Sequence, residues 1–134
     1  MRLPEVRIIG AGLAGVEAAH LLAKNGVSVE LCEMRPTTMT PAHKTDLLAE
    51  LVCSNSLKGS DPLTAHGILK REMAGLGSLV LAVAERTRVP AGKALAVDRA
   101  AFAESITRHI TSLSEIMLRR EEVKTIDRDR LTII

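Results

Sequence analysis

The sequence is almost without aromatic side chains, because its 134 residues include one Phe and neither Trp nor Tyr. Such a chain offers no platform on which the bases of a single-stranded nucleic acid could stack. Its net charge of +2 comes from basic residues that are interleaved with acids, so no basic stripe is present either. Any contact of this protein with nucleic acid is therefore expected to lie mostly outside this stretch.

Cysteine is also scarce, and no long apolar run is present. Cys32 and Cys53 are too few and too differently placed for a disulfide framework or a zinc site, so we expect reduced thiols and no metal. The longest apolar stretch, 78–84, is far too short to cross a membrane. The first predicted strand begins almost at once, without a secretory leader. These absences predict a cytoplasmic protein that does not bind a membrane.

What the chain does contain is enough material for one domain, with 46% hydrophobic and 25% charged residues. Near its start, an apolar run at 6–9, a glycine-rich segment, a helical pattern ending at Asn25-Gly26 and an alternating segment at 27–32 lead to Glu33. Strand, glycine turn, helix, strand and acid in this order predict a βαβ unit over residues 5–33. The glycine-rich segment is Gly10-Ala11-Gly12-Leu13-Ala14-Gly15.

Each part of this unit has a physical task in binding a dinucleotide. Gly10 permits a tight turn, Gly12 lets the backbone approach a pyrophosphate, and Gly15 lets the helix pack closely on the strand. The first amides of the helix and its dipole then face the phosphates. Glu33, at the end of the second strand, is expected to accept hydrogen bonds from both ribose hydroxyls and to repel a 2′-phosphate, which disfavours NADP. The alternative is that the glycines serve packing only.

The rest of the chain is predicted from periodicity and capping residues. A long loop at 34–44 is of the kind that carries function. Helix starts are indicated at Thr45 or Asp46, at Asp61-Pro62 and at Asp98. The last strand runs to the final residue without a stop signal, which suggests a truncated domain or an edge strand. We expect helices at 47–52, 62–76, 78–86 and 99–113, and strands at 116–118, 123–126 and 131–134.

Five segments after the βαβ unit stand in the order seen in one family. They are EMRP at 33–36, TPAH at 40–43, AELVCSNSLK at 49–58, GILK at 67–70 and VPAGKALAVDR at 89–99. With them, the chain from Val6 to about Ile126 closely resembles the N-terminal part of the bacterial folate- and FAD-dependent tRNA uracil-5-methyltransferase (TrmFO) family. The resemblance corresponds to roughly the first third of such an enzyme.

The resemblance implies an α/β fold, with a Rossmann-like FAD-binding βαβ unit, additional helices and a C-terminal β segment, as an incomplete flavoprotein domain. Its expected parts are the βαβ unit 5–33, a loop and helical insertion 34–97, and helix and strands 98–134. Family members take a carbon unit from methylenetetrahydrofolate, use reduced FAD, methylate carbon 5 of the T-loop uridine of tRNA and draw electrons from NAD(P)H. The implied cofactor-binding residues are Gly10, Ala11, Gly12, Leu13, Ala14, Gly15, Glu33, Met34 and Arg35.

The resemblance also implies a catalytic role for Cys53, with a partner cysteine beyond Ile134. A thiolate near a flavin and a pyrimidine adds to an electron-poor ring carbon or moves a proton. The alternative is that Cys53 is a small buried hydrophobe, which is the expectation for Cys32. His43 is expected to hydrogen-bond locally, and Asp98 to cap a helix.

The sequence is therefore compatible with three alternative functions. The first is the FAD-binding portion of a folate- and FAD-dependent tRNA methyltransferase. The second is another FAD-dependent oxidoreductase or tRNA-modifying flavoprotein that shares the βαβ unit. The third is a truncated, non-catalytic module that binds a dinucleotide weakly or not at all. Flavin absorbance of the purified chain discriminates the third from the others.

Overall fold

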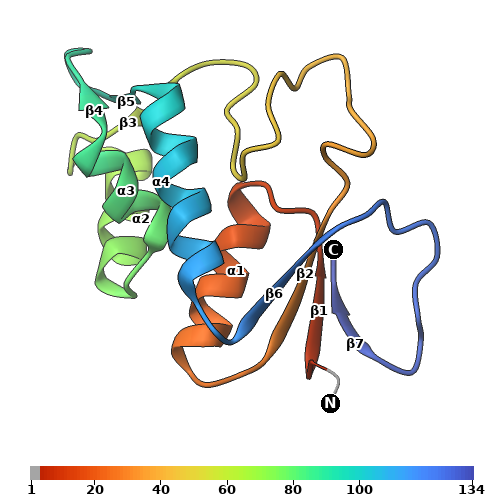
Figure 1. Ribbon diagram of the computed structural model, residues 1–134. Coiled ribbons are helices and arrows are strands. Elements are labelled where there is room, and N and C mark those ends of the chain that lie inside the picture. The colour runs from red at the N-terminus through yellow and green to blue at the C-terminus, as the bar shows by residue number, and fades with distance from the viewer. Residues whose placement is uncertain (1–3) are drawn as a thin grey trace.

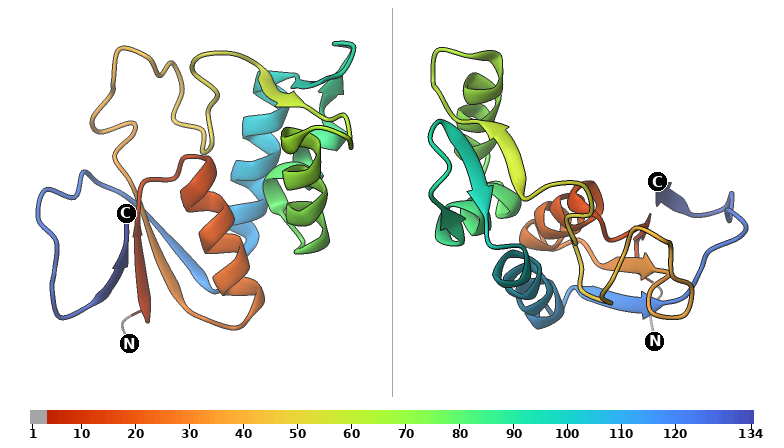
Figure 2. Two further views of the ribbon diagram at one scale, coloured as in Figure 1. Left: turned by 180° about the vertical axis from the view of Figure 1, so that it is seen from behind. Right: turned by 90° about the horizontal axis from the view of Figure 1, so that it is seen from above.

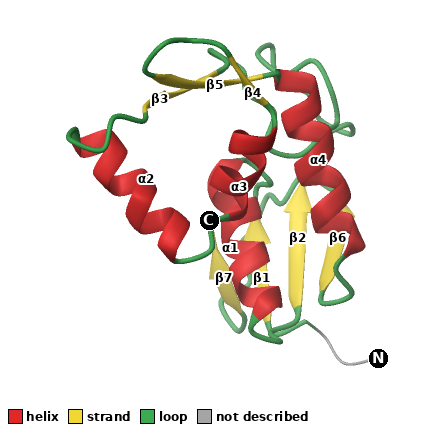
Figure 3. Ribbon diagram, turned by 90° about the vertical axis from the view of Figure 1, so that its left-hand side faces the viewer, coloured by secondary structure: helices red, strands yellow, loops and turns green. Residues whose placement is uncertain are grey.

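The structure, a computed structural model, describes residues 4–134 and contains two sheets and four helices within them. A parallel sheet has the strand order β6-β2-β1-β7, and a small antiparallel sheet has the order β3-β5-β4 (Figures 1 and 3). The strands are β1 Val6–Ile9, β2 Val29–Glu33, β3 Ser56–Gly59, β4 Arg88–Val89, β5 Ala94–Val97, β6 Ile116–Arg120 and β7 Leu131–Ile133. The helices are α1 Leu13–Lys24, α2 Ala65–Gly75, α3 Leu79–Arg86 and α4 Arg99–Ser112.

The predicted βαβ unit is confirmed. Strands β1 and β2 pair in parallel from Val6 opposite Val29 to Ile9 opposite Cys32, and α1 connects them. The helix starts earlier than its pattern indicates, because Gly12 is its N-cap and the second half of the glycine segment is already helical. It ends at Asn25, as expected.

The helices lie on one side of the parallel sheet, as the view from above shows (Figure 2). Apolar side chains of the strands meet those of α1 and α4 there and form the core. Burial of such side chains is the main favourable contribution to folding. The buried set includes Val6, Ile8, Val29, Leu31 and Ile116 from the strands, Val16 and Ala19 from α1, and Phe102, Ile106 and Ile110 from α4.

The sheet face away from the helices holds a buried charge, Glu30, that hydrophobic patterning does not reveal. The Glu30 carboxylate is 1% exposed and pairs with Arg7 at 2.6 Å, Arg130 at 2.6 Å and Arg119 at 3.1 Å. Burial works to raise the pKa of Glu30, but the hydrogen bond from Arg7 and the charge of Arg130 outweigh it and lower the pKa. This cluster ties the 121–130 segment to β1, β2 and β6.

Two polar residues of α1, Glu17 and His20, contact other helices, whereas Lys24 on the same face is exposed. Glu17 receives hydrogen bonds from the Ser78 hydroxyl at 2.6 Å and from the amides of Leu79 at 2.8 Å and Val80 at 3.1 Å. A carboxylate at this position satisfies the first amides of α3 and complements its dipole. One turn further on, His20 meets His109 of α4, with His20 Nδ1 and His109 Nε2 3.1 Å apart.

The histidine pair gives the fold a pH dependence. Burial lowers the pKa of His109, and the charges of His20 and of Arg86 on α3 lower it further. Since the folded-state pKa lies below that of the unfolded chain, the unfolded state binds more protons in the interval between them. The stability that His109 contributes is present above about pH 6.5 and is lost as the pH falls through the folded-state value.

Urea unfolding at pH 7.5 and pH 5.5 tests this dependence. We expect His109→Gln to reduce the loss of unfolding free energy between the two pH values, because the group that titrates is gone. His66→Gln, at an exposed position of α2, is the matched control and should leave the loss unchanged. A loss that is identical in all three proteins would contradict the assignment.

Several predicted elements are wrong. Residues 47–52 form an irregular loop with a turn at 48–49 and not a helix, and α2 begins three residues after Pro62, with Thr64 as its N-cap. The segment 123–126 is a loop. The sheet β3-β5-β4 was not predicted, because its strands are two to four residues long and pair only through contacts distant in sequence. By contrast, Asp98 caps α4 as expected, accepting from the Ala101 amide at 3.0 Å.

Candidate nucleotide-binding site

The glycine turn lies at the carboxyl end of β1, between β2 and β7. Gly10 has φ +97°, a backbone conformation that favours glycine, and its amide donates to the Cys32 carbonyl at 2.8 Å. A Cβ on Gly15 would lie 1.8 Å from the Gly10 carbonyl oxygen, whereas one on Gly12 would meet nothing within 4 Å. Gly15 therefore serves packing, and Gly12 leaves the backbone open to a ligand.

Cavities lie against both sides of this turn. One has a volume of about 380 Å³ and the other about 310 Å³, and both are lined by Gly10 and Gly12. After β1 the chain continues to β2 on one side, while β7 pairs with β1 on the other side. The glycine turn therefore lies at a topological switch point, where the strand order reverses and where open α/β sheets bind ligands. We call the larger cavity the crevice. It is lined by Ile9, Gly10, Gly12, Cys32, Glu33, Met34, Arg35, His43, Glu50, Glu121, Glu122 and Val123.

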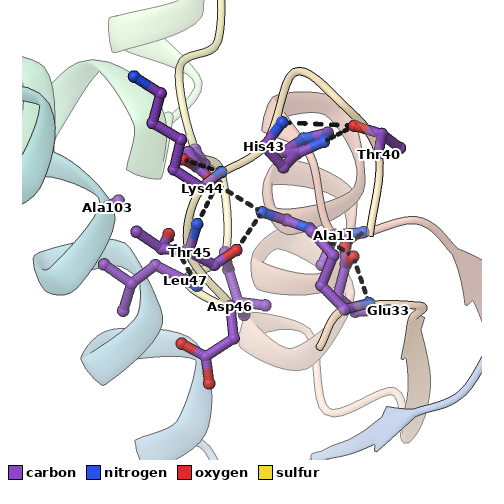
Figure 4. Close-up of polar contacts among 12 residues, drawn as sticks. Ala11, Glu33, Thr40, His43, Lys44, Thr45, Asp46, Leu47 and Ala103 are labelled. Carbon is purple, nitrogen blue, oxygen red and sulfur yellow. Dashed lines mark hydrogen bonds and ion pairs between the residues drawn. The ribbon is translucent and has the colours of Figure 1, made fainter. Parts of the chain in front are cut away.

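Glu33 lies in the crevice and is held by the protein itself. One oxygen accepts from the Ala11 amide at 3.0 Å, and the other accepts from the Arg35 amide at 3.1 Å and from Arg35 Nε at 2.8 Å (Figure 4). A carboxylate accepts about four hydrogen bonds, so roughly one position remains for a ribose hydroxyl. The expectation that Glu33 serves both ribose hydroxyls at once does not fit this geometry unless a ligand displaces an internal donor.

The carboxylate of Glu33 is ionised despite being only 4% exposed. Burial works to raise its pKa, but the hydrogen bonds from the Arg35 side chain and from the amides of Arg35 and Ala11 outweigh burial, and the pKa is lowered. The site therefore presents a fixed negative charge next to the glycine turn.

Residues 34–50 form an ordered loop that returns to the glycine turn. The Ala49 amide donates to the Ala11 carbonyl at 2.8 Å, so both polar backbone groups of Ala11 are engaged. The loop is held by Glu50, which accepts from the amides of Lys44 and Thr45 and from Arg35. Sequence reasoning missed Glu50, because an ion pair across 15 residues of irregular chain leaves no periodic signal.

A second segment, 121–123, follows the carboxyl end of β6 and also lines the crevice. Glu122 accepts from the Thr38 hydroxyl at 3.2 Å, which joins this segment to the 34–50 loop. Glu121 and Glu122 line the crevice and remain exposed to solvent. His43 also lines the crevice and bonds to Thr40 at 2.6 Å, the local contact that was expected (Figure 4).

The two cysteines differ in accessibility. Cys32 is 1% exposed, and its burial, followed by the charge of Glu30, raises the pKa of its thiol, so it is an inert core residue as expected. Cys53 is exposed, which rules out a buried structural role. It lies between Ala49, whose amide bonds to the glycine turn, and β3, and it is not one of the residues that line the crevice.

Within residues 4–134, no three His, Cys, Asp or Glu side chains are grouped so that they could hold a metal ion. None of the helices in that range has the length and apolar character needed to cross a bilayer.

The sequence of this chain is similar to that of one protein family and of several curated proteins. The sequence profile of the family described as "Glucose inhibited division protein A" matches residues 5–134. "Methylenetetrahydrofolate--tRNA-(uracil-5-)-methyltransferase TrmFO" of Carboxydothermus hydrogenoformans is 54% identical over 132 residues, which are 98% of this chain and 30% of that protein. The protein of the same name from Thermotoga neapolitana is 56% identical over 124 residues, 92% of this chain and 28% of the relative.

The chain thus spans about 30% of the length of these curated relatives. Among solved structures, Aquifex aeolicus GidA in the form II crystal superposes with a TM-score of 0.73 at 21% identity, covering 94% of this chain and 21% of that one. At this identity the likeness shows the fold alone, and it confirms the α/β class expected from the sequence.

Proposed function

Because this chain belongs to the family described as glucose inhibited division protein A, we propose that it is the FAD-binding portion of a flavoprotein tRNA methyltransferase. The reaction we propose takes the carbon unit from methylenetetrahydrofolate and places it on carbon 5 of the T-loop uridine. Electrons would come from NAD(P)H, and a tRNA substrate suggests the cytoplasm. The substrate classes follow the names of the curated relatives, which are 54% and 56% identical to this chain.

The observation that carries the proposal is the open glycine turn beside an ionised carboxylate. Gly12 has free space where a side chain would stand, and α1 begins directly after it. The first amides of a helix have no partner within the helix, so they are available to a pyrophosphate. Glu33 lies at the end of the neighbouring strand, where the ribose of an adenosine would sit.

The residues present fit the adenosine diphosphate half of FAD. The pyrophosphate would lie over Gly10, Ala11 and Gly12 with Leu13, Ala14 and Gly15 in the first turn of α1, and the ribose would lie at Glu33 with Met34 and Arg35 beside it. The crevice of about 380 Å³ falls in the size range of small-molecule sites. When bound, FAD supplies the redox chemistry, while this part of the chain binds and orients it.

Flavin binding by the purified chain tests the cofactor assignment. We expect FAD to bind and FMN to bind much more weakly, because FMN lacks the adenosine half for which the site is built. Equilibrium dialysis with absorbance detection measures both affinities. A chain that binds neither would contradict the proposal and favour the non-catalytic module. A chain that binds FMN as well as FAD would contradict the assignment of the adenosine half to this site.

Cys53 is the proposed catalytic residue, and a chimera tests it. The corresponding N-terminal region of the Carboxydothermus relative is replaced by this chain, and methyl transfer to unmodified tRNA is measured with methylenetetrahydrofolate. We expect the chimera to methylate carbon 5 of the T-loop uridine and Cys53→Ser to reduce the rate by about 100-fold or more, as loss of a nucleophile or proton donor does.

Ser54→Ala is the matched control in the same chimera, because it changes a small exposed side chain next to Cys53 that does not line the crevice. It should leave methyl transfer near that of the parent chimera. If Cys53→Ser keeps full activity, Cys53 has no catalytic role. If a folded, flavin-loaded chimera transfers no methyl group, another FAD-dependent oxidoreductase becomes the better assignment.

A further inference from the structure

One guanidinium is shared between two carboxylates in the crevice. Arg35, only 2% exposed, donates from Nε to Glu33 at 2.8 Å and from Nη1 to Glu50 at 2.9 Å. Its Nη1 also donates to the Thr45 carbonyl at 3.2 Å. Arginine and carboxylate commonly pair through two parallel bonds, but here the side chain gives Glu33 a single side-chain bond and turns its other engaged nitrogen to Glu50.

Glu50 is fixed more firmly than a surface acid. Its side chain is 14% exposed, and its two oxygens accept from the Lys44 amide at 3.0 Å and the Thr45 amide at 3.2 Å. Burial works to raise the pKa of Glu50, but these amides and the charge of Arg35 outweigh it and lower the pKa. Glu50 is therefore a fixed negative charge that holds Arg35 from the side opposite Glu33.

The position of Arg35 matters for the ribose end of a nucleotide. In dinucleotide sites an acid at the end of the second strand binds a free ribose, whereas an arginine nearby accommodates a ribose 2′-phosphate. Both residue types stand here, at Glu33 and Arg35, and both line the crevice. Among the groups of residues 4–134, none accepts from Arg35 Nη2, while Glu50 and the Thr45 carbonyl engage Nη1, so Arg35 cannot present both terminal nitrogens to a phosphate together.

We propose that Glu50 is a positioning residue that makes the site select an unphosphorylated ribose, by holding Arg35 away from full pairing with Glu33 and from a 2′-phosphate. The inference rests on the proposed nucleotide site and adds its specificity. Because Arg35 Nη1 donates both to Glu50 and to the Thr45 carbonyl, this nitrogen is not free to pair with a phosphate monoester.

The test compares ADP with its 2′-phosphorylated form by isothermal titration calorimetry. The unmodified chain should prefer ADP. Glu50→Gln keeps the shape of the side chain and removes its charge, so Arg35 pairs with Glu33 or with the added phosphate. We expect the preference for ADP to fall by about tenfold or more, the effect of one charge-assisted hydrogen bond. Glu50→Asp, which keeps the carboxylate, should stay closer to the unmodified chain.

Glu121→Gln is the matched control. It removes one negative charge from the same crevice at a residue whose ion-pair contact is to Arg119 and not to Arg35. We expect it to change the preference much less than Glu50→Gln. An equal change would mean that the overall field of the crevice selects the ligand, and it would overturn the role of Glu50.

A merely structural role is distinguished by the ratio of the two affinities. If Glu50→Gln weakens both ligands in parallel, Glu50 only supports the loop, and the proposal is wrong. If Glu50→Gln does not fold, the test is repeated with Arg35→Gln and with the double variant Arg35→Gln/Glu50→Gln. The double variant removes both charges of the Arg35–Glu50 pair, so neither is left unpaired. We expect these two variants to share one preference, because Glu50 acts through Arg35; a difference between them overturns the inference.

Failure of the proposed function has a separate signature. If the unmodified, folded chain binds neither ADP nor FAD, the nucleotide site itself is refuted, and the role of Glu50 with it. If it binds ADP and the variants keep its preference, only the role of Glu50 is refuted.

Discussion

A Gly12→Leu variant is expected to fold, with a loss of about 1 kcal/mol because leucine is a poorer N-cap residue than glycine, and to lose FAD. Gly12 is the N-cap of α1 with φ −73° and ψ −169°, a conformation open to any residue, and a Cβ there meets no atom of the chain within 4 Å. The leucine side chain would therefore enter the space that the pyrophosphate needs. We expect affinity for FAD to fall by about 100-fold or more, because the contacts between phosphate and main-chain amides are blocked.

Retained flavin and the melting temperature, measured on the same preparation, separate binding from folding. Gly75→Leu is the matched control: it introduces the same side chain at a glycine of α2 where a Cβ also meets nothing within 4 Å. Gly75→Leu should keep its flavin. A folded Gly12→Leu protein with normal flavin content would remove the basis of the nucleotide site.

Gly15→Ala, three residues further on, is expected to have the opposite effect and to destabilise the fold itself. Its Cβ would lie 1.8 Å from the carbonyl oxygen and 3.0 Å from the carbonyl carbon of Gly10. These are backbone atoms in the turn that joins β1 to α1, so relief requires the helix to move off the strand. Overpacking typically costs about 1–3 kcal/mol, and a clash between backbone atoms lies at the upper end, so we expect a loss of about 3 kcal/mol or more of unfolding free energy, a large part of the stability of a small domain.

Denaturant unfolding at constant protein concentration measures this loss. Gly75→Ala is the matched control in a helix with free space, and it should stabilise by about 0.5–1 kcal/mol because alanine loses less conformational freedom on folding than glycine. If Gly15→Ala unfolds at the same denaturant concentration as the unmodified chain, the close approach of α1 to β1 is not a feature of the protein in solution.

The two glycines of this motif have different surroundings, because a Cβ on Gly12 would meet open space and one on Gly15 would clash with the Gly10 carbonyl. In the proposed site, Gly12 therefore leaves room for the ligand, while Gly15 allows the close packing of α1 on β1. The motif predicted both roles, since it fixes how far each glycine stands from the end of β1.

Prediction from the sequence was most successful where structure is local. The βαβ unit, the caps at Asn25 and Asp98 and the burial of Cys32 all follow from short-range patterns, because turn, cap and strand alternation are decided by neighbouring residues. The predictions failed between residues 45 and 64 and at 123–126. In these segments hydrophobic residues are bounded by turn residues, and short apolar runs do not distinguish helix, strand and loop.

The candidate site divides in the same way. The sequence alone determined the glycine turn and the acid at the end of β2, because their spacing is set by one helix and two strands. Only the tertiary structure decided what surrounds Glu33: Arg35 and Glu50 pair through a loop without periodicity, and Glu122 comes from a strand end far along the chain. Buried charges find partners wherever the fold brings opposite charge, and no spacing in the sequence announces such a pairing.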